Sequence, residues 1–91
     1  MDAKFPGKGK VAVLKTQPDT VLDDYSRLIA LAGCETALNP SLETLLKMNV
    51  SWQTWYPSCS TTPWQLEGVI RSLRTAGFGS LIGAHNDTVV V

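Results

Sequence analysis

The stretch TTPWQLEGVIRSLRTAGFGSLIGA, residues 61–84, decides the fold class because it holds a complete helix-to-strand unit. Thr62 followed by Pro63 is typical of a helix start, since threonine can cap the first turn and proline suits the first helical position. Apolar residues then recur at helical spacing, namely Leu66, Val69, Ile70 and Leu73. Gly77 predicts the end of this helix, and the apolar residues 78–84 predict a strand.

A second unit of the same kind precedes it. Residues 10–16, KVAVLKT, are short, apolar and rich in β-branched side chains, which predicts a first strand buried on both faces. Asp19 or Thr20 can cap the helix that follows. Its apolar face is expected to comprise Val21, Tyr25, Leu28, Ile29 and Ala32. Gly33 suits the left-handed position after a helix end.

The intervening segments complete the expected order. Residues 34–41 predict a connection, because Pro40 forbids a helix across it. Residues 42–50, LETLLKMNV, fit helix or strand by periodicity alone, but their short length and their place after a proline favour a second strand. Residues 85–88, HNDT, predict a turn, and the valines after them predict the start of another strand. This order predicts an α/β fold: a partial three-layer parallel sheet with βαβαβ order.

Residues 1–9 are expected to form a loose leader, and residues 10–91 a single α/β domain. A parallel sheet needs helices on both faces, and two helices with three or four strands are few for that. The sequence also ends within an apolar run of valines. We therefore expect the N-terminal part of a larger domain. The alternative is a 91-residue protein that completes its sheet by oligomerising.

Composition excludes several classes of function. The chain is 44% hydrophobic, and its 8 basic and 8 acidic side chains cancel, which does not suit nucleic-acid binding. No apolar run is long enough for a membrane span, and the first residues lack the apolar core of a secretory signal. Two cysteines fit free thiols in a reducing compartment, so we expect a cytoplasmic protein. A disulfide between Cys34 and Cys59 remains open.

The long connection KMNVSWQTWYPSCSTTP, residues 47–63, is the feature that points to a site. Its aromatic residues, Trp52, Trp55 and Tyr56, favour an ordered loop over a disordered insertion. Ligands of open parallel sheets bind beyond the carboxyl ends of the strands, and this loop begins there. The residues that we expect at this edge as a ligand-binding set are Lys47, Asn49, Thr61 and His85.

Each of these residues has a plain interpretation beside the functional one. Lys47 could bind an anion, or act as a base if it were buried, or simply extend into solvent. Asn49 could orient a ligand or close a local turn, and Thr61 could support an anion at the helix start. His85 could be a ligand or a surface turn residue. Cys59, His85 and Asp87 are too scattered to predict a metal site, and we assign none.

Two of these motifs resemble a known family. LLKMN, residues 45–49, resembles the lysine-proline-asparagine strand end of the domain of unknown function family 362, with Met48 in place of the proline. STTPWQLEGVIRSLRTAGF, residues 60–78, resembles the threonine-x-proline helix start of that family and its alanine-glycine helix end. The resemblance covers most of residues 10–84. The departure at Met48 loosens the backbone at the strand exit.

The resemblance implies a longer protein of which this chain is the N-terminal portion. Many members carry cysteine clusters for [4Fe–4S] centres, but Cys34 and Cys59 cannot form such a run, so no cofactor is expected within this chain. The hypothesis is part of a redox or small-anion-binding protein. The alternative is a non-enzymatic interaction module that docks through its aromatic loop on the remainder of its own chain or another subunit. The sequence does not identify a reaction. Whether the protein is an enzyme therefore stays open.

Overall fold

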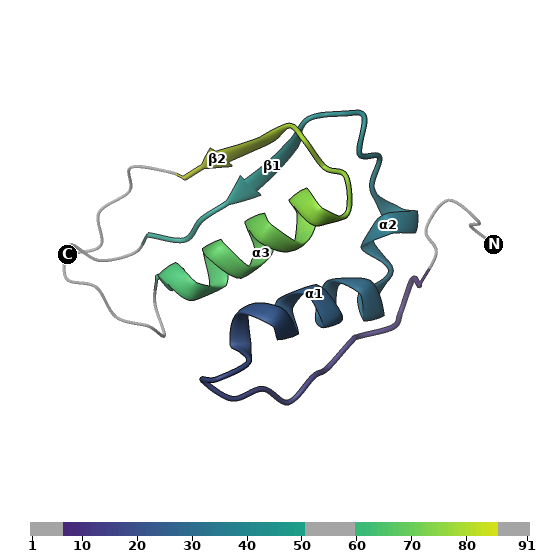
Figure 1. Cartoon of the computed structure of the whole chain (residues 1–91). Coiled ribbons are helices and arrows are strands. Elements are labelled where there is room, and N and C mark those ends of the chain that lie inside the picture. The colour runs from purple at the N-terminus through teal and green to yellow at the C-terminus, as the bar shows by residue number, and fades with distance from the viewer. Residues whose placement is uncertain (1–6, 51–59, 86–91) are drawn as a thin grey trace.

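Three helices and a two-stranded parallel sheet make up residues 7–50 and 60–85, the part of the chain that this computed structural model describes (Figure 1). The elements follow one another as α1 (Val21–Ala32), α2 (Cys34–Ala37), β1 (Thr44–Lys47), α3 (Pro63–Thr75) and β2 (Leu81–Ala84). The chain is thus a mixed helix and strand domain. No helix of the described residues is long and apolar enough to cross a membrane.

The sheet consists of β1 and β2, which lie in parallel register from Thr44 opposite Leu81 to Lys47 opposite Ala84. Backbone hydrogen bonds continue the pairing beyond both ends, from the Thr44 N–H to the Ser80 carbonyl and from the Met48 N–H to the Ala84 carbonyl. The strand alternative predicted for residues 42–50 is therefore confirmed, over a shorter span. α3 is the crossover between the two strands, as parallel pairing requires.

The start of α3 is the one that the sequence predicts. The Thr62 side chain accepts a hydrogen bond from the Gln65 N–H at 3.3 Å, and Pro63 occupies the first turn. Along the predicted apolar face Leu73 is buried, and Leu66, Val69 and Ile70 are half-buried. Gly77, with φ of 98°, follows the helix end. Of the elements described here, this helix agrees most closely with its prediction from the sequence.

α3 packs on α1 through a second face, made of small residues. Gly68 lies against the Tyr25 ring, so closely that a Cβ built on it would be 2.5 Å from Tyr25 Cδ2. One turn further on, Ser26 Oγ donates to Ser72 Oγ at 3.0 Å, and Ser72 Oγ donates to the Gly68 carbonyl at 2.6 Å. Gly68 and Ser72 are both buried. Small side chains let the two helix backbones approach, and the serines bond across the contact.

α1 has the predicted span, but its start is built differently from a simple cap. The Thr20 side chain makes no capping bond and donates instead to Asp24 Oδ2 at 2.7 Å. Gly33 ends the helix in the left-handed conformation, with φ of 78°, as predicted. The chain then forms α2, a single turn of helix where the sequence had predicted part of a connection. α2 ends at Ala37, before Pro40.

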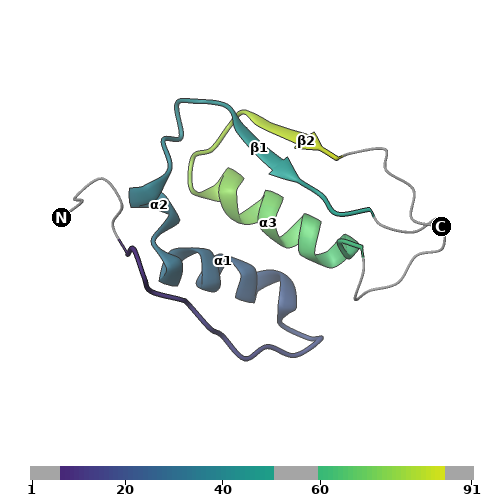
Figure 2. The ribbon, with the colours of Figure 1, turned by 180° about the vertical axis from the view of Figure 1, so that it is seen from behind.

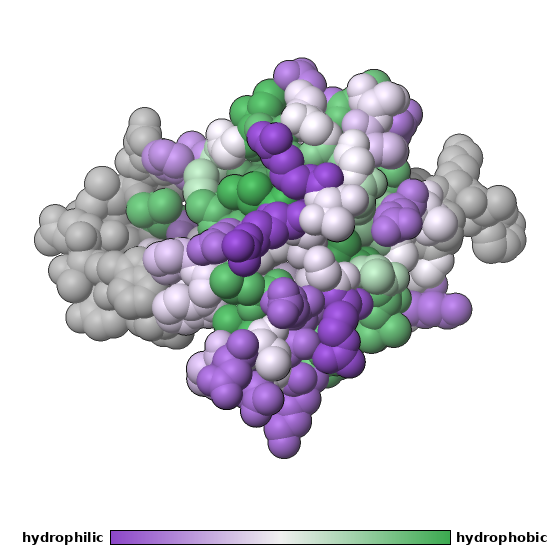
Figure 3. Space-filling view, in the orientation of Figure 1, coloured by the Kyte–Doolittle hydropathy of each residue, from purple (hydrophilic) through white to green (hydrophobic). Residues whose placement is uncertain are grey.

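The buried apolar core of the described residues is small. Within residues 7–50 and 60–85, the buried hydrophobic residues are Leu73 and Phe78, at 3% and 1% exposure. Phe78 was predicted within the third strand, but it follows the α3 end instead, its N–H bonded to the Leu73 carbonyl, and β2 begins three residues later. Apolar side chains remain at the surface over several elements, as the hydropathy view shows (Figure 3).

The prediction of a first strand at residues 10–16, buried on both faces, is wrong for this structure. These residues are extended but belong to no strand, and Val11 and Val13 are 86% and 80% exposed. They run along α1 on the side away from α3, as both views show (Figures 1 and 2). β propensity makes the segment extended, but a strand needs a neighbouring edge, and the described sheet does not supply one here.

In consequence the three-layer βαβαβ arrangement is not seen among the described residues, where the sheet has two strands. The predicted strand at residues 89–91 lies outside the described residues, as does most of the predicted leader. Of that leader, residues 7–9 form part of a turn closed by the Lys10 N–H and the Gly7 carbonyl, 2.9 Å apart.

Candidate functional site

The carboxyl ends of β1 and β2 meet at one edge, which we call the carboxyl rim and define by residues 47–49, 61–62 and 84–85. The parallel register sets Lys47 opposite Ala84, and the Met48 N–H bonds to the Ala84 carbonyl at 2.8 Å. Lys47 therefore lies beside the strand exit that leads into His85. The register thus brings the backbones of two of the four predicted site residues to the same strand end.

The other two predicted residues are joined directly. The Thr61 N–H donates to the Asn49 carbonyl at 2.8 Å, and the Asn49 N–H donates to Thr61 Oγ1, also at 2.8 Å. This reciprocal pair ties the exit of β1 to the entry of α3 across the long connection. Residues 51–59, which include Cys59 and the aromatic residues of the predicted loop, lie outside the described residues.

The reciprocal pair limits what Thr61 can offer a ligand. Its hydroxyl oxygen already accepts from the Asn49 backbone, which leaves its proton for donation. The start of α3 is committed in a similar way, because Thr62 accepts from the Gln65 N–H and the Thr62 carbonyl accepts from the Leu66 N–H. Pro63 has no N–H. The positive end of the helix dipole remains at the rim, but few of its donors are open.

Lys47 supplies the accessible positive charge of the rim. Along β1, Thr44 and Leu46 are half-buried while Leu45 and Lys47 are exposed, so Lys47 lies on the open face of the sheet. It has no ion-pair partner among the described residues. The burial that would make Lys47 a base is absent, which leaves anion binding as the functional interpretation that fits its position.

His85 is exposed at the exit of β2 and is the last residue that the structure describes. The cysteine, histidine and acidic side chains of the described residues include no group of three that could hold a metal ion. Cys34 is a half-buried free thiol in α2, and its predicted alternative partner Cys59 lies outside the described residues. No cluster ligand set is thus formed by the described part of the chain.

A buried polar network lies at the start of α1 and was not predicted from the sequence. Asp24, 6% exposed, accepts hydrogen bonds from Thr16 Oγ1 and Thr20 Oγ1, each at 2.7 Å, and from Arg27 at 2.9 Å. The bonds from Thr16 and Thr20, and then the Arg27 guanidinium, hold the pKa of Asp24 below its usual 3.8, against an opposing effect of burial. The Thr16 hydroxyl is therefore committed to this network.

This network is structural. Both carboxylate oxygens of Asp24 have donors within it, and it fixes the end of residues 10–16 to the first turn of α1. The spacing was visible in the sequence, with Thr20 four residues before Asp24 and Arg27 three residues after it, on one face of a helix. The partner at Thr16 could not be read from spacing.

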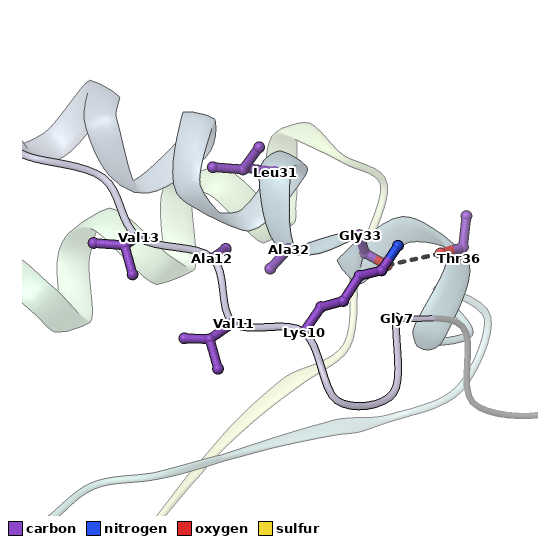
Figure 4. Close-up of a pocket in the computed structure, with 9 residues that line it drawn as sticks. All are labelled: Gly7, Lys10, Val11, Ala12, Val13, Leu31, Ala32, Gly33 and Thr36. Atoms are coloured by element: carbon purple, nitrogen blue, oxygen red, sulfur yellow. Dashed lines mark hydrogen bonds between the residues drawn. The ribbon is translucent and has the colours of Figure 1, made fainter.

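A hollow of about 580 Å³ lies away from the carboxyl rim (Figure 4). It is bounded by the extended segment on one side and by the end of α1 on the other, with Val11, Val13, Leu31 and Ala32 among its lining. Most of its lining residues are apolar, and Lys10 is the ionisable side chain among them. This lining is better suited to docking than to catalysis.

Comparison with protein-family models, with curated proteins and with solved structures gives no match for this chain. The resemblance to family 362 stays a prediction that rests on the two quoted motifs.

Proposed function

We propose that the carboxyl rim binds a small anionic ligand. The proposal rests on one observation: the parallel register of β1 and β2 places Lys47 beside the strand exit into His85. Lys47, which has no carboxylate partner among the described residues, offers positive charge and N–H donors. Lys47 lies on the open face, so the ligand lies across the end of the sheet rather than in a closed pocket.

The motifs that resemble those of family 362 support the same location. Lys47 and Asn49 come from one motif and Thr61 from the other, and the reciprocal bonds between Asn49 and Thr61 hold the two together. In a longer family-362-like protein this rim would take part in a redox reaction or bind a small anion. A [4Fe–4S] cluster in such a protein would take its ligands from cysteines outside this chain.

The test is a titration with inorganic phosphate and, in a separate experiment, with succinate. Binding is monitored through the amide chemical shifts in two-dimensional NMR spectra. Saturable shifts at Met48 and His85 are expected, and the Lys47→Ala variant is expected to lose them while Lys47→Arg retains them. Arg74→Ala removes one positive charge from the exposed last turn of α3 and serves as the matched control. Unsaturable shifts, or equal loss in the Arg74 variant, would overturn the proposal.

A second candidate function, a non-enzymatic interaction module, is favoured by the exposed apolar surface. Leu45 and Ile82 lie opposite each other in the register and are 67% and 39% exposed. A parallel sheet normally has both faces covered. The matched test is Leu45→Ser against Lys47→Ala in a sedimentation experiment. A module of this kind would change its association with the first variant and not with the second.

A further inference from the structure

We propose that residues 10–16, which we call the open edge, bind an extended, acidic segment of another protein as an added β-strand. The open edge is already strand-like. Ala12 and Leu14 are half-buried while Val11 and Val13 are exposed, so side chains alternate between two sides. Figure 4 shows Ala12 directed toward α1, with Val11 and Val13 directed away from it.

The backbone of the open edge supplies the unused hydrogen-bonding groups that strand addition needs. Residues 11–15 make no backbone hydrogen bond to another described residue. Strand addition gains affinity from main-chain hydrogen bonds and selectivity from alternate side chains. Val11 and Val13 would then meet apolar, β-branched side chains at every second position of the added segment.

The open edge is tied to α1 at one end and bounded by a local turn at the other, which lowers the entropy lost on binding. At one end the Thr16 hydroxyl bonds to the buried Asp24 at 2.7 Å. At the other end the Lys10 N–H closes a turn onto the Gly7 carbonyl at 2.9 Å. Between these points the hollow of about 580 Å³, lined by Val11, Val13, Leu31 and Ala32, offers space for side chains of the added strand.

Charge decides the kind of occupant. The open edge carries two lysines, Lys10 and Lys15, and no acidic residue, although the whole chain is neutral. Lysines on an edge strand oppose pairing with an identical edge, because they bring like charges together, so a second copy is disfavoured. An extended segment with acidic residues at its ends meets the same lysines favourably. The complementary partner is thus an acidic, β-branched strand.

The probe is a labelled nine-residue peptide in which valine and threonine alternate between pairs of glutamates, with binding measured by fluorescence anisotropy. We expect saturable binding that weakens as salt is raised. A peptide with lysines in place of the glutamates is expected to bind at least about tenfold more weakly. A peptide with N-methylated alternate amides should bind no better than the lysine peptide, because it cannot pair along that edge.

Variants separate the contributions of charge and apolar contact. Lys15→Glu should weaken binding several-fold, whereas Arg71→Glu, the same charge change on the exposed face of α3, should leave it unchanged. The double variant Val11→Thr and Val13→Thr keeps β propensity and should weaken binding about tenfold. Circular dichroism of each variant verifies that α1 and α3 are retained.

Amide exchange gives a readout specific to strand pairing. Alternate amides of residues 11–15 should exchange more slowly when the acidic peptide is bound. Equal binding of acidic, lysine and N-methylated peptides would overturn the proposal, as would absence of binding. Self-association that the valine double variant abolishes would assign the open edge to a second copy and overturn it as well.

Discussion

Gly68 of α3 lies against the ring of Tyr25 of α1, with no room for a side chain at the glycine. A built Cβ would be 2.5 Å from Tyr25 Cδ2 and 2.8 Å from Tyr25 Cγ. These atoms lie close to the tyrosine backbone, so the ring cannot move aside without shifting α1. The glycine therefore sets the distance between the two helices.

Gly68→Ala is expected to destabilise the protein by about 1–3 kcal/mol, the usual cost of overpacking. Alanine alone would favour the helix by up to ~1 kcal/mol, so the sign of the result distinguishes packing from propensity. Urea unfolding followed by circular dichroism measures it. Combining Gly68→Ala with Tyr25→Ala should recover part of the loss relative to Tyr25→Ala alone. Stabilisation by Gly68→Ala in the otherwise unchanged protein would contradict the contact.

Thr62→Ala should destabilise the protein by about 1 kcal/mol, because the Gln65 N–H loses its acceptor at the first turn of α3. Thr62→Ser keeps the oxygen and is the matched control, with a smaller effect expected. Both can be measured by thermal unfolding. Equal losses in the two variants would assign the effect to packing of the buried Thr62 methyl group rather than to the cap.

The Asp24 network makes stability depend on pH in a defined direction. Its hydrogen bonds lower the pKa of Asp24 in the folded state below the usual 3.8, so the unfolded chain takes up this proton first as pH falls. The stabilisation is fully present above pH 3.8 and is lost as the pH drops from there through the lower folded value. Above that range of pH, Asp24 does not make the free energy of unfolding depend on pH.

The measurement compares urea midpoints of the natural protein and Asp24→Asn from about pH 6 down to about pH 2. The natural protein should be more stable at the upper end, and its advantage should shrink as the pH falls through the window below 3.8. Thr16→Val removes one donor and should narrow that window. An advantage that stays constant across the range would show that ionisation of Asp24 is not what stabilises the fold.

The elements that sequence determines best here are those whose signals are local. Thr62 and Pro63 start α3 where predicted, and Gly33 ends α1 where predicted, because caps and left-handed glycines act within one turn. Gly68 was open to the same analysis, since an isolated glycine within a helical pattern has a packing reason when the helix persists. Its partner Tyr25, 43 residues away, was not readable.

The failures concern neighbours in space. Residues 10–16 have the composition of a buried strand, yet composition cannot say whether an edge lies beside them. At the carboxyl rim the outcome is mixed. The rule for parallel sheets predicted that Lys47 and His85 would lie at one edge of the sheet, whereas the bond from the Asn49 N–H to Thr61 Oγ1 depends on how the long connection closes.

That closure leads to the last prediction. Thr61→Val keeps the shape of the side chain but removes the oxygen that accepts from the Asn49 N–H, so the reciprocal pair is reduced to one bond. The loss expected is about 0.5–1.5 kcal/mol, since the site is exposed and water can replace the acceptor. Thr61→Ser retains the oxygen and should stay close to the natural protein.

Amide exchange distinguishes this local effect from a general one. In Thr61→Val the Asn49 amide should exchange faster, whereas the Leu73 and Phe78 amides, beside the buried core, should change only by the global loss of stability. If phosphate binding at the rim also weakens in Thr61→Val but not in Thr61→Ser, the reciprocal pair positions Lys47 for its ligand. Unchanged binding in both variants would limit Asn49 and Thr61 to closing the connection between β1 and α3.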